Sequence, residues 1–294
     1  MTRKLFGAVG TLVFVLVFNF FLFRVVESDP VATLFRGTRL TEDQRARLYD
    51  EFGVNDPLPE QFAKYVRETS QLNFGYSYEG HRPVRSEIGD ALWPTVWLVG
   101  LSTLLSTVIG LALGVYSGWR RGTRGDYAST AFSMFTYSMP DFWLGLLLLG
   151  FLGSQQGWFP TGGISDPGVT GGLSKLVDQA HHLVLPCLTL TVAYLGEYAI
   201  VMRSSLLDTL GEDYLLLARA KGLRDALVRR RHAVPNALLP VVTLVAINFG
   251  FVLSGAIAVE SIFSWPGLGH ATFRAIPRPT YRCSRGSSCS SARL

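Results

Sequence analysis

The sequence predicts an all-α polytopic membrane protein. Its composition, its apolar segments and the placement of its basic residues all indicate this class. Of the 294 residues, 48% are hydrophobic and 17% are charged, whereas an ordinary soluble domain carries about a quarter charged residues. The three cysteines are too few for a disulfide framework and have no metal-binding or redox spacing. The composition therefore excludes a disordered chain, a disulfide scaffold and an ordinary cytosolic enzyme.

Five apolar segments are long enough to cross a hydrocarbon core of about 30 Å at about 1.5 Å per residue. They cover residues 5–26, 91–116, 128–153, 183–201 and 237–262. A signal peptide begins as the first segment does, but its apolar centre is about 7–15 residues long and a small-residue cleavage site follows. Here Arg-Val-Val-Glu-Ser-Asp-Pro follows instead. We therefore expect residues 1–27 to form an uncleaved N-terminal transmembrane helix.

Residues 28–90 form a hydrophilic stretch that holds half of the 22 acidic residues. Turn signals interrupt it at Gly53, Asp56-Pro57 and Asn73-Phe74-Gly75. The run Thr41-Glu-Asp-Gln predicts the start of a helix with Thr41 as its N-cap. We expect a folded insert between membrane spans.

The basic residues predict the orientation in the membrane. Arg and Lys crowd the short loops after the second and fourth apolar segments, whereas loop 154–182 contains a single basic residue, Lys175. Because short cytoplasmic loops carry the positive charges, we expect a cytoplasmic N-terminus, with Arg3 and Lys4, and an extracytoplasmic insert 28–90. The net charge of +5 then reflects topology, and we expect no nucleic-acid partner.

Gly110, Gly114 and Gly118 recur at four-residue spacing within the second apolar segment. Such a ridge of small residues lets another membrane helix approach closely, although membrane helices are rich in glycine in general. We use the spacing only as a packing prediction.

The cytoplasmic loop between the fourth and fifth apolar segments, about 206–236, carries an amphipathic pattern. We expect a helix from about Glu212, a break at Gly222, and a second, basic helix that ends at Pro235. Leu216, Leu217, Ala220 and Leu223 make one side of this loop apolar. That side must be buried either against the chain's own spans or in the groove of a partner. Gly222 permits a positive φ at the bend.

Ionisable groups inside membrane spans are costly and often functional. For Asp141, next to Pro140, we consider two roles. Its carboxylate either contacts the substrate in a transport pathway or is satisfied by backbone amides that the proline frees. For Glu197 we favour a structural role over a substrate contact. It lies six residues from Arg203, a spacing that is poor for a direct ion pair on a helix. Glu260 predicts a group that stabilises a turn near the outer surface. The adjacent His181 and His182 lack further ligands in sequence, so we expect an interfacial loop there and no metal site.

The cytoplasmic loop resembles the coupling loop of ABC-importer permeases. Ala218, Gly222 and Pro235 match its loose signature, and residues 218–223 and 236–243 are similar to the oligopeptide, dipeptide and nickel permease family. Further similar segments follow in family order along residues 5 to 276: 53–62, 73–77, 138–145 and 260–269. The insert resembles that of the first permease subunit of such systems.

Two departures from the family pattern are visible. Asp141 stands where Ser or Thr is expected, and Leu215-Leu-Leu replaces a more polar run before Ala218. The second departure puts in doubt which ATPase the loop accepts.

The resemblance implies an ABC-importer type I permease fold with a permease core over residues 91–276. It implies an ATPase-docking site made of Asp213, Tyr214, Ala218, Arg219, Ala220, Lys221, Gly222 and Leu223, with Pro140, Asp141 and Glu197 as candidate pathway residues. No nucleotide-binding Gly-x-x-x-x-Gly-Lys-Ser/Thr motif occurs. The chain is then a non-enzymatic subunit without cofactor, metal or catalytic residue, and separate partners use ATP and Mg²⁺.

The implied partners are a second permease subunit, two ABC ATPase subunits, an extracytoplasmic substrate-binding protein and membrane lipid, in the bacterial plasma (inner) membrane. The implied function is import of short peptides by alternating access. Nickel chelates and oligosaccharides are alternative cargoes in the same family. A secondary transporter or channel is a different class, which has no need for a glycine-bent basic loop. A membrane enzyme is disfavoured because His-Glu-x-x-His and Gly-x-Ser-x-Gly are absent.

The end of the sequence departs from the family, which has a sixth span there. After Gly269 the chain carries five arginines and a polar run from Tyr281 to Leu294. One choice of codons for residues 282–294, read with one added nucleotide in front, encodes an apolar run. We therefore expect residues 277–294 to be a frameshifted tail, five spans to be present and a sixth to be lost. If the tail is genuine, a non-functional truncated permease is the alternative.

Overall fold

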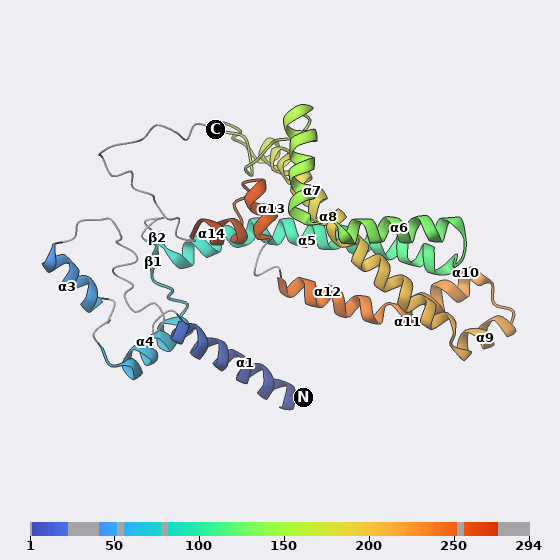
Figure 1. Cartoon of the computed structure of the whole chain (residues 1–294), viewed down its shortest axis with the longest axis horizontal. Coiled ribbons are helices and arrows are strands. Elements are labelled where there is room, and N and C mark those ends of the chain that lie inside the picture. The colour runs from blue at the N-terminus through green and yellow to red at the C-terminus, as the bar shows by residue number, and fades with distance from the viewer. Residues whose placement is uncertain (1, 23–40, 52–55, 78–81, 252–255, 276–294) are drawn as a thin grey trace, which may run out of the picture. The chain divides into compact units, whose positions relative to one another are not determined.

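A computed structural model describes residues 2–22, 41–51, 56–77, 82–251 and 256–275. The chain divides into two compact units, Met1–Gly89 and Asp90–Leu294, and Figure 1 shows their elements. The tail from residue 277 lies outside the described residues, as do parts of the first and fifth apolar segments.

The first unit contains three helices and a short antiparallel strand pair among its described residues. These are α1 (Thr2–Phe21), α3 (Glu42–Glu51), α4 (Leu58–Ser70), β1 (Tyr76–Ser77) and β2 (Arg82–Pro83). The Thr41 hydroxyl accepts a hydrogen bond from the Gln44 backbone N–H at 3.3 Å, and the Gln44 side chain accepts one from the Thr41 N–H at 3.1 Å. This reciprocal capping box confirms the predicted helix start.

Aromatic side chains join α4 to α1 within this unit. The ring of Phe20 lies 5.1 Å from that of Phe62 and 5.7 Å from that of Tyr65, measured between centroids. After α4 the chain turns through Leu72 and Gly75, both at positive φ, where the sequence placed a turn.

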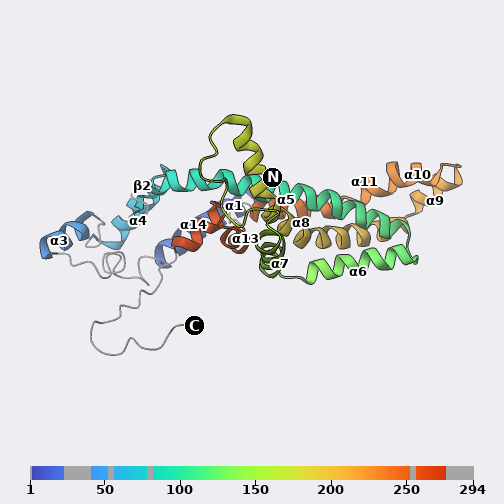
Figure 2. The ribbon, with the colours of Figure 1, turned by 90° about the horizontal axis from the view of Figure 1, so that it is seen from above.

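The regular secondary structure in the described part of the second unit is helical. After α5 (Val84–Trp119), which begins in the first unit, it contains α6 (Arg124–Ser138), α7 (Asp141–Leu148), the π-helix η2 (Leu149–Gln155), α8 (Gly172–Leu210), α9 (Asp213–Ala220), α10 (Asp225–Val228), the π-helix η3 (Arg229–Ala233), α11 (Val234–Ala237), α12 (Leu239–Phe251), α13 (Ile257–Ile262) and α14 (Leu268–Ala275). In Figures 1 and 2, α5, α6 and α8 run side by side toward the end that carries α9 to α11.

Glycines allow the backbone of α5 to approach α8. A Cβ at Gly110 would lie 2.7 Å from the Cβ of Tyr198, and one at Gly114 would lie 2.6 Å from the Cβ of Met202. Real Cβ atoms do not approach so closely, so only glycine fits at these two positions. These contacts confirm the predicted packing ridge. Lipid supplies no hydrophobic driving force between helices, so close packing of this kind is what holds them together.

One buried ion pair joins α6 to α8. Arg203 donates to both carboxylate oxygens of Asp126, at 2.8 Å from Nε and 3.1 Å from the second guanidinium nitrogen. Asp126 precedes the apolar segment that begins at residue 128, and its side chain is 3% exposed. The hydrogen bonds from Arg203 lower the pKa of Asp126 to about 2. The partner of Arg203 is therefore Asp126, which sequence spacing did not indicate.

The structure does not confirm the count of five spans. Among the residues that the structure describes, two helices, α5 and α8, are long and apolar enough to cross a membrane. Two bent pairs qualify only if each is one span: α6 with α7 and η2, bent by 95°, and α10–α11 with α12, bent by 46°. The continuous apolar part of α1, Phe6–Phe21, is shorter than the length required of a span.

Pro140 interrupts the apolar segment 128–153 between α6 and α7, in agreement with the expected proline break. Two local predictions were wrong. Pro235 does not end a helix. It lies in the first turn of α11, where a missing N–H costs nothing. His181 and His182 lie inside α8 and not in a loop.

Candidate functional site

The loop between α8 and α12 begins with α9, which ends in a glycine turn. The Gly222 N–H donates to the Arg219 carbonyl at 2.9 Å and the Leu223 N–H donates to the Ala218 carbonyl at 3.3 Å. This is a Schellman motif, and Gly222 has the left-handed φ of +79° that it requires. The predicted positive φ at the bend is confirmed.

One face of α9 is buried within the chain. Leu215 and Ala218 pack in a cluster with Met202 and Leu206 of α8 and with Val228. Leu215 and Ala218, which the sequence did not assign to the predicted apolar side, are therefore the residues that turn toward the chain's own helices. Leu215, Leu216 and Leu217 are successive, so the spacing of apolar residues did not show which of these leucines faces the chain's own helices.

A second apolar face of α9 is exposed. The side chains of Leu216 and Leu217 are 59% and 57% exposed, and Ala220 lies beside them in the open. Asp213, Arg219 and Lys221 are also exposed. The loop thus buries one apolar face in the chain and leaves a second without cover among the described residues.

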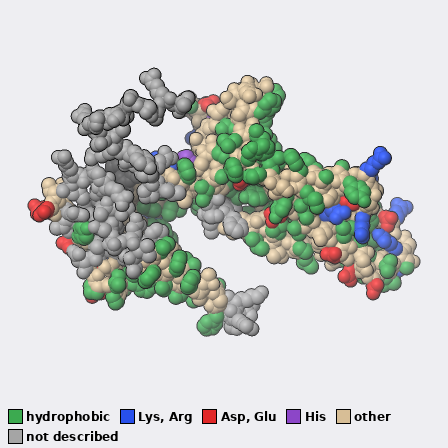
Figure 3. Space-filling model, in the orientation of Figure 1, with side chains coloured by type: hydrophobic (Ala, Val, Ile, Leu, Met, Phe, Trp, Pro, Cys, Tyr) green, Lys and Arg blue, Asp and Glu red, His purple; other side chains and the backbone are tan. Residues whose placement is uncertain are grey.

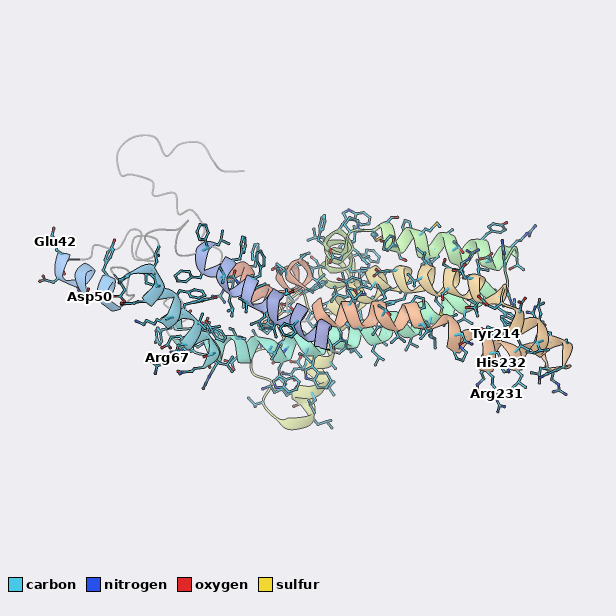
Figure 4. The ribbon with its side chains drawn as sticks, turned by 90° about the horizontal axis from the view of Figure 1, so that it is seen from below. Glu42, Asp50, Arg67, Tyr214, Arg231 and His232 are labelled. Carbon is cyan, nitrogen blue, oxygen red and sulfur yellow. The ribbon has the colours of Figure 1, made fainter. Side chains whose placement is uncertain are left out.

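Charged side chains lie at the same end of the second unit as this exposed face. Figure 3 shows several Lys and Arg side chains, together with some Asp and Glu, at the end formed by α9 and α10. Figure 4 shows Tyr214 near His232, whose carbonyl accepts a hydrogen bond from the Tyr214 hydroxyl at 3.4 Å, and Arg231 at the same end.

Trp119, at the end of α5, has two arginines over its ring. The guanidinium carbons of Arg219 and Arg229 are 5.9 Å and 5.7 Å from the ring centroid. Both distances are within the range of a cation–π interaction. The loop is therefore attached to α5 as well as to α8.

A cavity of about 270 Å³ lies in the second unit, away from this loop. Its walls come from α5, α8, α12 and Ala256, through Val99, Thr103, Leu190, Tyr194, Tyr198, Asn248 and Ala256. The Asn248 side-chain amide donates to the Tyr198 hydroxyl at 2.9 Å. The cavity combines aliphatic walls with hydroxyl and amide groups, as small-molecule sites do.

Asp141 and Glu197 are not wall residues of this cavity. The Asp141 carboxylate accepts a hydrogen bond from the Phe142 N–H at 2.7 Å, at the start of α7 after Pro140. A backbone amide at the proline break thus satisfies part of it. Glu197 lies three residues after the wall residue Tyr194 in α8, so these two side chains are neighbours on the helix surface.

Glu260 is fully buried and stabilises a turn, as predicted. It accepts hydrogen bonds from the Thr95 hydroxyl at 2.8 Å and from the His270 N–H at 3.0 Å. A Cβ at Gly267 would collide with its carboxylate. The acidic side chain of Glu260 therefore joins α13 and α14 to α5.

One group of side chains has the composition of a metal site. Asp166, Asp178 and His182 each offer a ligand atom, and these atoms lie within 4.8 Å of one another. Sequence reasoning named His182 but expected no metal site, and it missed both aspartates. The four-residue spacing of Asp178 and His182 was a visible signal on a helix, whereas Asp166 lies 16 residues from His182 and only the fold of the preceding loop brings it close.

Sequence reasoning also missed the cavity, since none of its wall residues was among the candidate pathway residues. Tyr194 and Tyr198 are one helical turn apart, and Asn248 is a polar residue within the apolar α12. These two signals were present in the sequence. Thr103 gave no signal, since hydroxyl residues are common in membrane helices.

Comparison with known proteins identifies the class. Residues 110–278 match the family described as the binding-protein-dependent transport system inner membrane component, and residues 1–99 match the N-terminal part of such membrane components. The chain belongs to this family. It is a multi-pass inner-membrane permease subunit of an ABC importer, which carries no enzymatic activity and works with ATPase and substrate-binding partners.

Two relatives illustrate the similarity. The chain is 34% identical to the probable peptide ABC transporter permease protein y4tP of Sinorhizobium fredii, over 95% of this chain and 87% of the relative. It has the same identity and coverage with the glutathione transport system permease protein GsiC of Escherichia coli K12. A solved structure of the MetNI methionine ABC transporter, inward facing, aligns with a TM-score of 0.48 and 19% identity, covering 64% of this chain and 79% of that chain.

Proposed function

We propose that this subunit forms part of the pathway for short peptides and moves them by alternating access. In this proposal the loop from Asp213 to Leu223 binds an ATPase subunit, and the cavity at Tyr198 and Asn248 belongs to the pathway. The N-terminus is cytoplasmic, and a second permease subunit and membrane lipid surround the chain.

The observation that carries the proposal is the two-sided loop. Leu215 and Ala218 are buried against α8, whereas Leu216 and Leu217 are exposed. An exposed pair of leucines on a short helix is the feature that a hydrophobic groove of a partner accepts. The Lys and Arg side chains around it favour an acidic rim on that partner.

A continuous set of contacts supports coupling between the loop and the cavity. The buried cluster under α9 extends along α8 through Met202 and Leu206 to Tyr198. Tyr198 also lines the cavity and accepts the hydrogen bond from Asn248. Because packed interiors shift between discrete arrangements, a displacement of α9 would change the cavity through α8.

The chemistry around the cavity supports a peptide cargo. Its hydroxyl and amide groups match the hydrogen-bonding capacity of peptide bonds, and the nearby Asp141 and Glu197 favour a cationic amino terminus. The relatives named for peptide and for glutathione, which is a tripeptide, support the same class. Pro140 breaks the helix where Asp141 is placed.

Co-purification and vesicle transport test the proposal. The chain is expressed together with its proposed ATPase, second permease and binding-protein partners. Leu216→Glu is compared with Leu58→Glu, which alters a leucine of similar exposure in α4. We expect Leu216→Glu to remove the ATPase from the complex and Leu58→Glu to retain it. Gly222→Asp should abolish ATP-dependent uptake while leaving membrane insertion intact.

Two results would contradict the proposal. Uptake of peptide by the purified chain alone, without ATP, would indicate a secondary transporter or channel. Uptake that is unchanged by Tyr198 and Asn248 variants, in a complex that still binds its ATPase, would remove the cavity from the pathway.

A further inference from the structure

We propose that Asp166, Asp178 and His182 bind a divalent transition-metal ion that attaches the loop before α8 to the first turns of that helix. The site lies outside the docking loop and the cavity, and no step of the proposed transport function requires it. It rests on three side chains from two segments that the fold brings together.

The histidine is positioned as metal-binding histidines are. His182 is 5% exposed, and its Nδ1 lies 2.9 Å from the Asp178 carbonyl oxygen. Donation from Nδ1 to a backbone carbonyl leaves the lone pair on Nε2, which is the usual arrangement for a histidine that binds a metal through its other nitrogen. The nearest charged atom to Nε2 is the Asp166 Oδ1, at 3.5 Å.

A neutral imidazole nitrogen and a carboxylate oxygen are both acceptors, so they do not attract each other. A cation between them removes this conflict. With metal–nitrogen and metal–oxygen bonds of about 2.0–2.2 Å, two ligand atoms of a tetrahedral site are separated by about 3.4 Å. The observed 3.5 Å between Nε2 and Asp166 Oδ1 matches that separation.

Asp178 supplies the second carboxylate and also orders the loop. Its Oδ1 lies 3.5 Å from the His182 Nδ1, and its ligand atom lies within 4.8 Å of those of Asp166 and His182. Its Oδ2 accepts a hydrogen bond from the Asp166 N–H at 2.8 Å, and its side chain is 13% exposed. Asp178 and His182 are one helical turn apart in α8, so both project on the same side of the helix. The Asp166 side chain is 67% exposed, which leaves an entry path for an ion.

The donor set selects the class of ion. One imidazole and two carboxylates suit Zn²⁺, Co²⁺, Ni²⁺ or Mn²⁺, whereas Ca²⁺ and Mg²⁺ favour oxygen donors alone. Three protein ligands leave at least one position open to water or to a group from another molecule.

The test uses the full-length purified chain, freed of any histidine tag, in detergent. Co²⁺ is added first, because its visible absorption reports the coordination geometry, and Zn²⁺ then competes for the site. We expect one ion per chain. Asp166→Asn and His182→Ala should each weaken the affinity at least about tenfold. His181→Ala is the matched control, since His181 contacts the Trp158 carbonyl instead.

Asp166→Asn keeps the test valid if His182→Ala fails to fold, because Asp166 is exposed. Zn²⁺ should also raise the unfolding temperature of the wild-type chain and leave that of Asp166→Asn unchanged. Binding of less than one ion per chain would overturn the proposal, and so would an equal loss in His181→Ala. Proton uptake by His182 without metal binding would show an ion pair in place of a metal site and would overturn it as well.

Discussion

The side-chain amide of Asn248 in α12 donates to the Tyr198 hydroxyl in α8 across 2.9 Å, at the wall of the cavity. Tyr198 also belongs to the cluster that buries one face of α9. This single side chain therefore contacts both the proposed pathway and the support of the proposed docking loop. Its substitution separates the two roles experimentally.

Tyr198→Phe removes the hydroxyl that accepts the Asn248 hydrogen bond while keeping the ring in the cluster. We expect lower peptide uptake with unchanged ATPase binding. In a double-mutant cycle with Asn248→Leu, thermal unfolding in detergent should give a coupling energy of about 0.6 kcal/mol, as for other membrane hydrogen bonds. Tyr137→Phe, at an exposed tyrosine of α6, is the control. Additive effects of the two substitutions would contradict a direct interaction.

Asp126→Asn breaks the ion pair that joins α6 to α8. Removing one partner leaves the other charge only partly solvated, and we expect a loss of unfolding free energy at or below about 3 kcal/mol, since Arg203 is 27% exposed. The exchanged pair Asp126→Arg with Arg203→Asp should regain part of that stability. Chemical unfolding measures it, with the exposed Asp208→Asn as control. A double variant that is no more stable than either single one would contradict the pair.

The same pair predicts a flat pH dependence near neutrality. The pKa of Asp126 is lowered to about 2 from an ordinary value of 3.8. A carboxylate with a lowered pKa adds stability above its ordinary pKa, and this contribution is lost as the pH falls toward 2. Between pH 5 and pH 8, about the range where most proteins are most stable, wild type and Asp126→Asn should differ by a constant amount. A difference that grows across this interval would disagree with the lowered pKa.

Gly114→Ala tests the close contact of α5 with α8. The new Cβ would lie 2.6 Å from the Cβ of Met202, so the helices must separate. We expect a loss of about 1–3 kcal/mol, typical of overpacking, measured by thermal unfolding. Gly100→Ala is a matched control in the same helix, because nothing lies within 4 Å of its Cβ. Equal effects at both positions would show that helix packing is not responsible.

Glu260→Gln tests the turn after the cavity. The carboxylate accepts one hydrogen bond from the Thr95 hydroxyl and one from the His270 N–H. A glutamine amide has only one acceptor oxygen, so its NH₂ group would face one of these two donors. The expected loss is about 1–3 kcal/mol, the cost of an unsatisfied buried group. Limited proteolysis of the segment after α12 should become faster. Glu212→Gln, in the open at the start of α9, should change neither quantity.

Local chemistry predicted several details correctly. The capping box at Thr41, the positive φ at Gly222 and the glycine contacts of α5 all depend on residues a few positions apart, or on the absence of a side chain. Their energies are decided within one or two helical turns, so spacing in the sequence is sufficient to find them.

Other details depend on contacts between distant segments. Asp126 and Arg203 lie 77 residues apart and Tyr198 and Asn248 lie 50 apart. Spacing carries no information on such pairs, because their separation is set by how helices pack. The sequence placed the break at Pro140 but not its angle of 95°, since a proline in an apolar run is compatible with a slight kink or with a complete break.

The sequence by itself determined the class of protein, because the free energy of placing apolar and charged residues in lipid depends on composition and order alone. It also determined the place of the α9 loop, through its basic residues and Gly222. Only the tertiary structure decided which leucines of α9 face inward, which carboxylate pairs with Arg203, and that Asp166 meets His182. Those outcomes arise from the packing of whole helices, where one residue's neighbours come from segments far along the chain.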